Sequence, residues 1–399
     1  MIVNSDLHIH SRYSGGTSDD MRIAVLAREA KRKGIQLVGT GDCLHPKWLK
    51  EIMETEKIDD GTFELDGTRF VLTTEVEDNR RVHHLLIFPS VSSIEEFKKN
   101  VGKRSQSFAT DGRPKMYMNG EEIANLVNDV DGLIGPCHAF TPWTGIYSAY
   151  DSISDSYGSA LPYISYIELG LSADSSYADR IAELSDILFL TNSDAHSPLL
   201  IRFAREFNRF EMDKITFDGL KKAILEKKIL LNVGFPPEEG KYNESACINC
   251  FKHFKLIEAK ERNWKCSCGG RIKKGVKDRV EELANYPLPK HPKHRPPYLH
   301  IIPLGEIIGK AIGASPTSKK VEEEWCALVG FYGNEANVLV DADIDKIIEI
   351  SGDKIGWAIE VFRENRIIVH PGGGGEYGRI ELPAVPEKKK KGQLCLSDF

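Results

Sequence analysis

Short apolar runs alternate with amphipathic stretches through residues 1–232. One amphipathic stretch, Met21–Gly34, is basic and ends at a glycine, which is a common stop signal for a helix. Repeated alternation of this kind predicts parallel β-α-β units, and about seven strands can close or nearly close a barrel. The runs that we expect to be strands are residues 2–10, 35–42, 69–77, 82–89, 132–140, 163–170 and 187–196.

The ends of these runs hold residue types that bind metals. Each run begins with apolar residues, and most end in histidine, aspartate, glutamate or cysteine. The carboxyl ends of the strands face the active site of a β/α barrel, so residues far apart in sequence should meet at one mouth. The candidates are His8, His10, Asp42, Glu75, the adjacent pair His83 and His84, His138, Asp194 and His196.

The spacing of these residues favours metal binding over a purely structural role. His8 and His10, like Asp194 and His196, are two residues apart and can face the same side of a strand. The alternative is that these are structural histidines, buried in the core and hydrogen-bonded there. Structural histidines rarely occur at the ends of successive strands. Mixed imidazole and carboxylate ligands suit Zn²⁺, Mn²⁺ or Fe²⁺ better than Mg²⁺ alone. The number of ligands indicates two or three ions, which is typical of phosphate-ester hydrolysis.

The pattern changes after residue 235, and the rest of the chain divides by composition. Residues 285–298 are rich in proline and cannot form a regular helix or a central strand. Helical periodicity returns after residue 300, and the last residues are charged. We therefore expect an α/β barrel over 1–235, a small cysteine-rich domain with an extended connector over 236–299, a mainly helical domain over 300–382 and a basic tail over 383–399.

Four of the eight cysteines lie in one cluster. Two close pairs separated by 15 residues predict a tetrahedral Cys₄ zinc site, and Gly269-Gly270 after the last cysteine fits a tight turn. A redox role is the weaker alternative. Zinc would stabilise a ribbon that is too small to bury a core of its own. The cluster consists of Cys247, Cys250, Cys266 and Cys268.

The distribution of charge suggests a polyanionic partner. The chain carries a net charge of -6, but residues 251–300 hold 13 Lys and Arg against 5 Asp and Glu. A basic segment attached to an acidic body is typical of a nucleic-acid-binding module, although a solvated surface is the alternative. The N-terminus lacks the pattern of a secretory signal, and no apolar run approaches the roughly 20 residues of a membrane span. We expect a cytoplasmic protein, associated with the nucleoid in a prokaryote, with no membrane partner.

The strand-end residues resemble the motifs of the PHP (polymerase and histidinol phosphatase) family. In order, they are His8/His10, Asp42-Cys43, Glu75, His84, His138 and Asp194/His196. The resemblance implies a distorted (β/α)7 barrel with a multinuclear metal site, and it favours His84, with His83 on the opposite face. Cys43 stands where the family usually has a histidine, so Cys43 ligates, His45 substitutes for it, or one ligand is lost.

The order of barrel, Cys₄ ribbon and helical region resembles the endonuclease Q family, including the segments GTGDCLHPKW and PGGGGEYG. This resemblance implies hydrolysis of duplex DNA on the 5′ side of uracil, hypoxanthine, xanthine or abasic sites. Asp194, Asp42 and Glu75 are then the candidate catalytic carboxylates. Zn²⁺ would occupy the ribbon and the barrel, with Mg²⁺ or Mn²⁺ supporting activity. A PHP-type phosphatase for a small phosphate monoester and a non-catalytic adaptor are the alternatives.

The C-terminus follows four lysines and fits the pattern Q-x-x-L-x-x-F. It resembles the peptides by which replication and repair proteins bind sliding clamps. Gln393 would enter a polar pocket, and Leu396 and Phe399 an apolar one. The segment also resembles the bacterial clamp peptide, so the type of clamp stays open.

Overall fold

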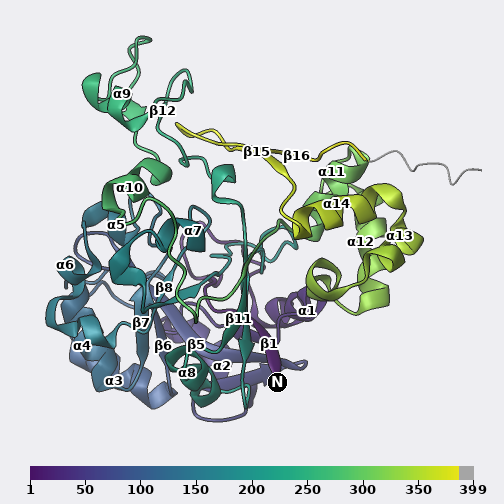
Figure 1. Cartoon of the computed structure of the whole chain (residues 1–399). Coiled ribbons are helices and arrows are strands. Elements are labelled where there is room, and N and C mark those ends of the chain that lie inside the picture. Colours follow the sequence, from purple (N-terminus) through teal and green to yellow (C-terminus); the bar gives the residue numbers. More distant parts are fainter. Residues whose placement is uncertain (386–399) are drawn as a thin grey trace, which may run out of the picture.

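The computed structural model describes residues 1–385, and the N-terminal part is an α/β barrel surrounded by helices (Figure 1). All the expected runs contain a strand. The clamp-like residues Gln393, Leu396 and Phe399 lie outside the described residues, so that interaction stays a prediction. The barrel strands are β1 (Ile2–Asp6), β2 (Leu37–Gly39), β5 (Thr68–Glu77), β6 (His83–Phe88), β7 (Leu133–Pro136), β8 (Tyr166–Glu168) and β9 (Leu188–Leu190).

Hydrogen-bonded ladders do not close the barrel. Strands β1, β2 and β5 are parallel neighbours, and β8 pairs in parallel with β9. Isolated bridges join the remaining gaps, between Ile134 and Ile164 and between Ile9 and Ala195. The α/β architecture is therefore confirmed, with an incomplete ring of strands.

The expectation of parallel β-α-β units is wrong at β6. This strand runs antiparallel to both β5 and β7. The reason is the connection from β5, which spans only residues 78–82. A parallel crossover needs a dozen or more residues, whereas so short a loop can only reverse the chain. As a consequence, the first residues of β6, not the last, lie at the mouth beside the carboxyl end of β5.

The barrel strands alternate between two hydrophobic layers. The inner layer also includes Phe217 and Leu220 of helix α8 (Phe217–Leu225). The outer layer packs against helices α1 (Ile23–Lys33), α2 (Pro46–Met53), α3 (Val91–Val101) and α4 (Gly120–Asp129). Inner strand residues include Leu37, Val71, Leu85, Ile87, Leu133, Tyr166, Leu188 and Leu190. Outer ones include Val38, Phe70, Leu72, Leu86, Phe88, Ile134, Ile167 and Phe189.

Further strands extend the sheet away from the ring. On one side of β1 lie β10 (Phe207–Glu211) and β11 (Ile229–Gly234), and β14 (Tyr298–His300) pairs in parallel with β11. The proline-rich connector thus ends by joining the main sheet. Smaller elements are β3 (Glu56–Lys57), β4 (Thr62–Leu65), α5 (Ile146–Ala149), α6 (Ile153–Tyr157), η1 (Gly158–Tyr163), α7 (Ser175–Ala178), η2 (Ala182–Leu184) and η3 (Pro237–Glu239).

The cysteine cluster forms a small ribbon that projects from the barrel (Figure 1). Its elements are β12 (Ala246–Cys247), α9 (Leu256–Glu261), β13 (Ile272–Lys273) and α10 (Val276–Leu283). Its core contains Phe254 and Ile272 beside the cysteines, with Trp264 packed against them. So small a core agrees with the expectation that the ribbon needs a metal.

The C-terminal region is mainly helical, as predicted, and ends in a hairpin that reaches toward the ribbon (Figure 1). In the glycine-rich loop of this hairpin, Gly374 has a φ of +65° and approaches the backbone of Cys247 so closely that a Cβ atom would lie 2.4 Å from its oxygen. The loop therefore supports the ribbon. The elements are α11 (Leu304–Ile312), α12 (Lys319–Tyr332), η4 (Asn337–Asp341), α13 (Ile344–Ser351), α14 (Asp353–Arg363), β15 (Ile368–His370) and β16 (Arg379–Glu381).

A buried ion pair joins the helical region to the barrel. Lys33, at the end of α1, donates to Glu335 Oε1 at 2.5 Å, and both side chains are almost fully buried. Glu335 also accepts from the Trp325 indole at 2.7 Å. Within residues 1–385, no helix combines the length and apolarity that crossing a membrane would require.

Replacing Lys33 with methionine should lower the thermal midpoint by roughly 5–10 °C, because an uncompensated buried carboxylate costs about 3 kcal/mol or more. Lys31→Met, on the exposed side of the same helix, is the matched control and should change it by less than about 2 °C. Differential scanning calorimetry measures both. Equal midpoints for the two variants would contradict this role of the ion pair.

Candidate metal centre

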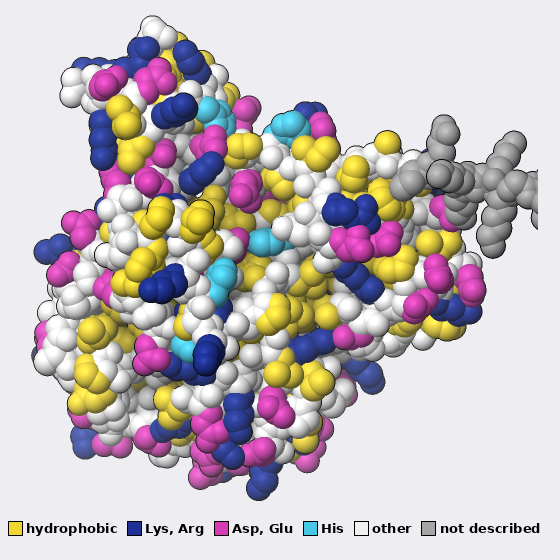
Figure 2. Space-filling view, viewed as in Figure 1, with side chains coloured by type: hydrophobic (Ala, Val, Ile, Leu, Met, Phe, Trp, Pro, Cys, Tyr) yellow, Lys and Arg dark blue, Asp and Glu magenta, His cyan; other side chains and the backbone are white. Residues whose placement is uncertain are grey.

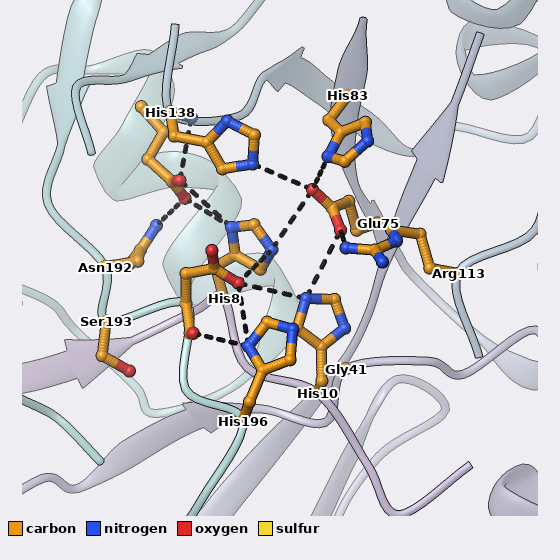
Figure 3. A network of polar contacts seen from close by, with 12 residues as sticks. His8, His10, Gly41, Glu75, His83, Arg113, His138, Asn192, Ser193 and His196 are labelled. Atoms are coloured by element: carbon orange, nitrogen blue, oxygen red, sulfur yellow. Dashed lines mark hydrogen bonds and ion pairs between the residues drawn. The ribbon is translucent and has the colours of Figure 1, made fainter. Parts of the chain in front are cut away.

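Side chains from separate strand ends converge at the barrel mouth (Figure 3). Asp194 Oδ1 lies 3.1 Å from His10 Nε2 and 3.7 Å from His8 Nε2. The three residues offer ligand atoms within 4.8 Å of one another. His196 stands beside them, with its ring centroid 4.4 Å from that of His10. The convergence expected from the sequence is therefore present for these four residues.

Glu75 links this group to a second cluster of imidazoles. Its Oε1 lies 2.5 Å from His83 Nδ1 and 3.1 Å from His138 Nε2, and its Oε2 lies 3.3 Å from His10 Nε2. The carboxylate is fully buried. Glu75 thus stands between two sets of possible ligands, as a carboxylate that bridges two ions would.

Asp42 contacts the ring nitrogen of His10 that faces away from the other predicted ligands. Its Oδ1 is 3.2 Å from His10 Nδ1, and its Oδ2 accepts from the amide and the hydroxyl of Ser11, both at 2.6 Å. A carboxylate in this position fixes the tautomer and orientation of an imidazole whose other nitrogen holds a metal. Asp42 was predicted as a ligand, and the geometry gives it an orienting position.

Glu168 plays the same part for His8, and the sequence analysis did not include it. Its Oε2 is 2.9 Å from His8 Nδ1 and accepts from the Asn192 amide at 2.8 Å. Its Oε1 accepts from the amide of His138 at 2.9 Å. The signal was available, because Glu168 lies near the end of the expected strand over 163–170, just as Glu75 lies near the end of the expected strand over 69–77.

The choice of His84 over His83 is corrected by the pairing of β5 with β6. Glu75 pairs with Leu85, which belongs to the inner layer, so His83, two residues earlier, also faces inward. His84 faces outward, where its Nδ1 lies 2.7 Å from the Tyr157 hydroxyl. The resemblance favoured the wrong member of the pair because it did not include the register of an antiparallel hairpin.

Neither proposed substitute for the missing second-motif histidine reaches the centre. Cys43 is fully buried in the outer hydrophobic layer, and burial raises the pKa of its thiol. His45 stacks on Tyr13 at 4.4 Å, and its Nε2 lies 3.3 Å from the Ala109 carbonyl. Among the described residues, neither belongs to a group that could hold an ion. Of the three alternatives, the loss of this ligand position is the one that agrees with where Cys43 and His45 lie.

The electrostatics of the centre suit cations. Burial by itself would lower the pKa of His8, but the facing carboxylate of Glu168, with Asp194 and Glu75, raises it to about 9. His8 Nε2 is buried without a hydrogen-bond partner in the described structure. A buried polar atom without a partner is costly, and a metal ion at this point would satisfy it. The donor set therefore fits divalent ions.

The backbone at the centre is strained. Asp42, His138 and Asp194 have φ values of +50°, +27° and +48°. Such conformations cost about 1–3 kcal/mol each in a residue other than glycine, and they persist only where surrounding contacts enforce them. Strain at three predicted site residues is typical of a functional site.

A pocket of about 450 Å³ opens onto the centre. His83, His138 and Asp194 line one side, and Trp143, Tyr242 and Tyr377 line another. The Trp143 backbone is strained, with a φ of +90°, and Lys273 of the ribbon lies 3.2 Å from the centroid of its ring. Figure 2 shows histidine side chains in the hollow between the barrel, the ribbon and the C-terminal helices.

The four clustered cysteines have the geometry of a tetrahedral metal site. The Sγ atoms of Cys247 and Cys268 are 3.4 Å apart, and those of Cys250 and Cys266 are 3.7 Å apart. Zinc–sulfur bonds of about 2.3 Å would place tetrahedral sulfurs about 3.8 Å apart. Gly270 is required here, because a Cβ atom would lie 2.6 Å from Cys247 Sγ. The cluster therefore fits one zinc ion.

A family profile and a curated relative each match part of the chain. A family profile described as the MJ0043 C-terminal domain matches residues 303–366. The uncharacterized protein MJ0043 of Methanocaldococcus jannaschii is 48% identical over 259 residues, a match that covers 63% of this chain and 32% of that protein.

Two solved structures match almost the whole chain. The lesion-specific endonuclease PfuEndoQ of Pyrococcus furiosus is 48% identical with a TM-score of 0.93, and the match covers 96% of each chain. A complex of endonuclease Q with a 27-mer duplex carrying an abasic lesion is also 48% identical, with a TM-score of 0.91, over 99% of this chain and 100% of that one. At this identity over nearly their full length, the protein belongs to the endonuclease Q family.

Proposed function

We propose that the protein is a metal-dependent endonuclease that cuts DNA beside damaged nucleotides. More specifically, the protein would hydrolyse the phosphodiester on the 5′ side of uracil, hypoxanthine, xanthine or an abasic site. The observation that carries the proposal is the buried cluster at the pocket floor, in which His8 Nε2 has no partner among the described residues. The similarity to endonuclease Q supports the choice of DNA as substrate.

The ligands divide into two groups around Glu75. His8, His10 and Asp194 would hold one ion, and His83 and His138 another. Ions bound there would activate the attacking water and neutralise charge on the phosphodiester. The number and identity of the ions are part of the proposal, with Zn²⁺, Mn²⁺ or Mg²⁺ as the candidates.

Asp194 is the best placed proton acceptor. Its side chain is 32% exposed, whereas those of Glu75 and Asp42 are fully buried. Among these three carboxylates, only Asp194 can therefore meet a water that enters from the pocket. Asp42 and Glu168 instead orient His10 and His8 through the ring nitrogens that face away from the centre.

The pocket wall suits an unpaired nucleotide. Trp143, Tyr242 and Tyr377 offer ring faces, and Lys241 and Lys273 lie over two of these rings. Aromatic and cationic side chains of this kind bind bases and phosphates with little dependence on sequence. Damaged or mismatched bases are the least costly to extrude from a duplex, so a lesion nucleotide would enter this pocket most easily.

Incubation with a labelled duplex that carries one uracil or abasic site should produce a single nick on its 5′ side in the presence of Mg²⁺ or Mn²⁺. Asp194→Asn should reduce the single-turnover rate by about 10²- to 10⁴-fold, because it removes the proton acceptor and one of the proposed metal ligands. A sequencing gel locates the nick. Hydrolysis of p-nitrophenyl phosphate without nicking would favour the small-molecule phosphatase, and tight DNA binding without cleavage would favour the adaptor.

His83→Asn should lower the metal content of the barrel, whereas His84→Asn should leave the metal content unchanged. The two residues are adjacent, but only His83 faces Glu75. Elemental analysis of the purified variants measures the effect, and the thiolate-bound zinc provides an internal reference. Metal loss in the His84 variant alone would reverse the assignment.

Cys266→Ser should release zinc from the ribbon and expose residues 247–273 to proteolysis, because so small a core depends on its metal. Cys326→Ser, which replaces an exposed cysteine outside the cluster, is the matched control. Mass spectrometry of the fragments and zinc analysis follow both variants. Equal protease resistance in the two would argue against a structural zinc.

A further inference from the structure

We propose that Arg113 binds the scissile phosphate directly and supplies a positive charge that belongs to the protein itself. The inference rests on the proposed function and adds a catalytic residue to it. Arg113 lies on the segment between α3 and α4, outside every strand-end motif of the sequence. Its guanidinium is directed at the metal centre beside Glu75 (Figure 3).

The position of Arg113 joins the centre to the pocket. Its Nη1 donates to Glu75 Oε2 at 3.2 Å, while 30% of its side chain remains exposed. It also lines the pocket that contains His138 and Asp194. A phosphate that reached the ligands from this pocket would therefore pass within the range of the guanidinium.

The backbone on both sides of Arg113 is fixed, so the side chain is held in place before substrate binds. Residues 114–116 pair with the end of β5, where the Glu77 amide donates to the Pro114 carbonyl and the Met116 amide donates to the Glu77 carbonyl. On the other side, Gly112 packs so tightly that a Cβ atom would lie 2.4 Å from the Asp42 carboxylate. Preorganised charge of this kind stabilises a transition state without the cost of rearrangement.

The chemistry of the guanidinium matches the task. It has five N–H donors in a planar fork that fits two phosphate oxygens. Among the described residues, Glu75 is the partner of its side-chain hydrogen bond. Glu75 is also shared with His10, His83 and His138, so ions held by these ligands would compete for its oxygens. Arg113 would then have donors free for the substrate.

The other basic residues of the pocket are placed differently. Lys241 lies over the Tyr377 ring, 4.6 Å from its centroid. Arg81 also lines the pocket, but it is exposed and forms no ion pair with Glu75 or Asp194 in the described structure. Arg113 is thus the pocket cation in contact with the metal centre. Arg104, an exposed arginine on the same segment but outside the pocket lining, provides a matched control.

The test compares Arg113→Met, Arg113→Lys and Arg104→Met with the unaltered protein on an abasic duplex. We expect Arg113→Met to lower the single-turnover rate at saturating enzyme by about 10²- to 10³-fold. Its metal content and its affinity for DNA in Ca²⁺ should stay within about threefold, because one lost phosphate contact weakens binding only modestly. Arg113→Lys should recover part of the rate, and Arg104→Met should stay within about threefold of the unaltered protein.

A phosphorothioate at the scissile position gives a readout that a structural role would not change. Sulfur in place of the oxygen that Arg113 contacts should slow the unaltered protein and have a smaller effect on Arg113→Met. The inference is overturned if Arg113→Met cleaves at the normal rate, or if it loses bound metal. Failure of the unaltered protein to cleave would instead overturn the proposed function, so the two failures are distinguishable.

Discussion

The arrangement of the barrel mouth depends on one buried carboxylate. Glu75 is removed from solvent and lies within 3.3 Å of His10, His83, His138 and Arg113. An isolated charge at such a depth would cost several kcal/mol, so it is stable only while positive groups surround it. The same requirement keeps two sets of imidazoles on either side of one carboxylate. Divalent cations held by these imidazoles would supply the positive charge that Glu75 needs.

The periodicity of apolar positions predicted the seven strands and the convergence of their ends at the barrel mouth. It did not predict the direction of every strand. The seven runs became strands because alternating apolar positions fill two layers, and this pattern is local. The reversal at β6 depends on a connection of only five residues, 78–82. The alternation of apolar and polar positions contains no information on the length of this connection. That reversal decides which histidine of the pair at 83 and 84 faces Glu75. Register between strands is a tertiary property, so a motif match that ignores it selects the wrong neighbour.

Residues in loops were the hardest to predict. Arg113 is in no strand, and nothing in its local sequence links it to Glu75. Trp143 is also in no strand, and its contact with Lys273 depends on how the ribbon packs against the barrel. Arg279 of α10 also donates to the carbonyls of Tyr147 and Tyr150. The ribbon therefore supports the loop that carries Trp143, which lines the pocket.

The most direct test of the account is anomalous diffraction from crystals grown with Mn²⁺, with data collected at the manganese and zinc absorption edges. The account predicts anomalous peaks on both sides of Glu75, one beside His8 and Asp194 and another beside His83 and His138. It also predicts a zinc peak among the four cysteines and none beside Cys43 or His84. Anomalous signal at the cysteines alone, in active crystals, would contradict the account.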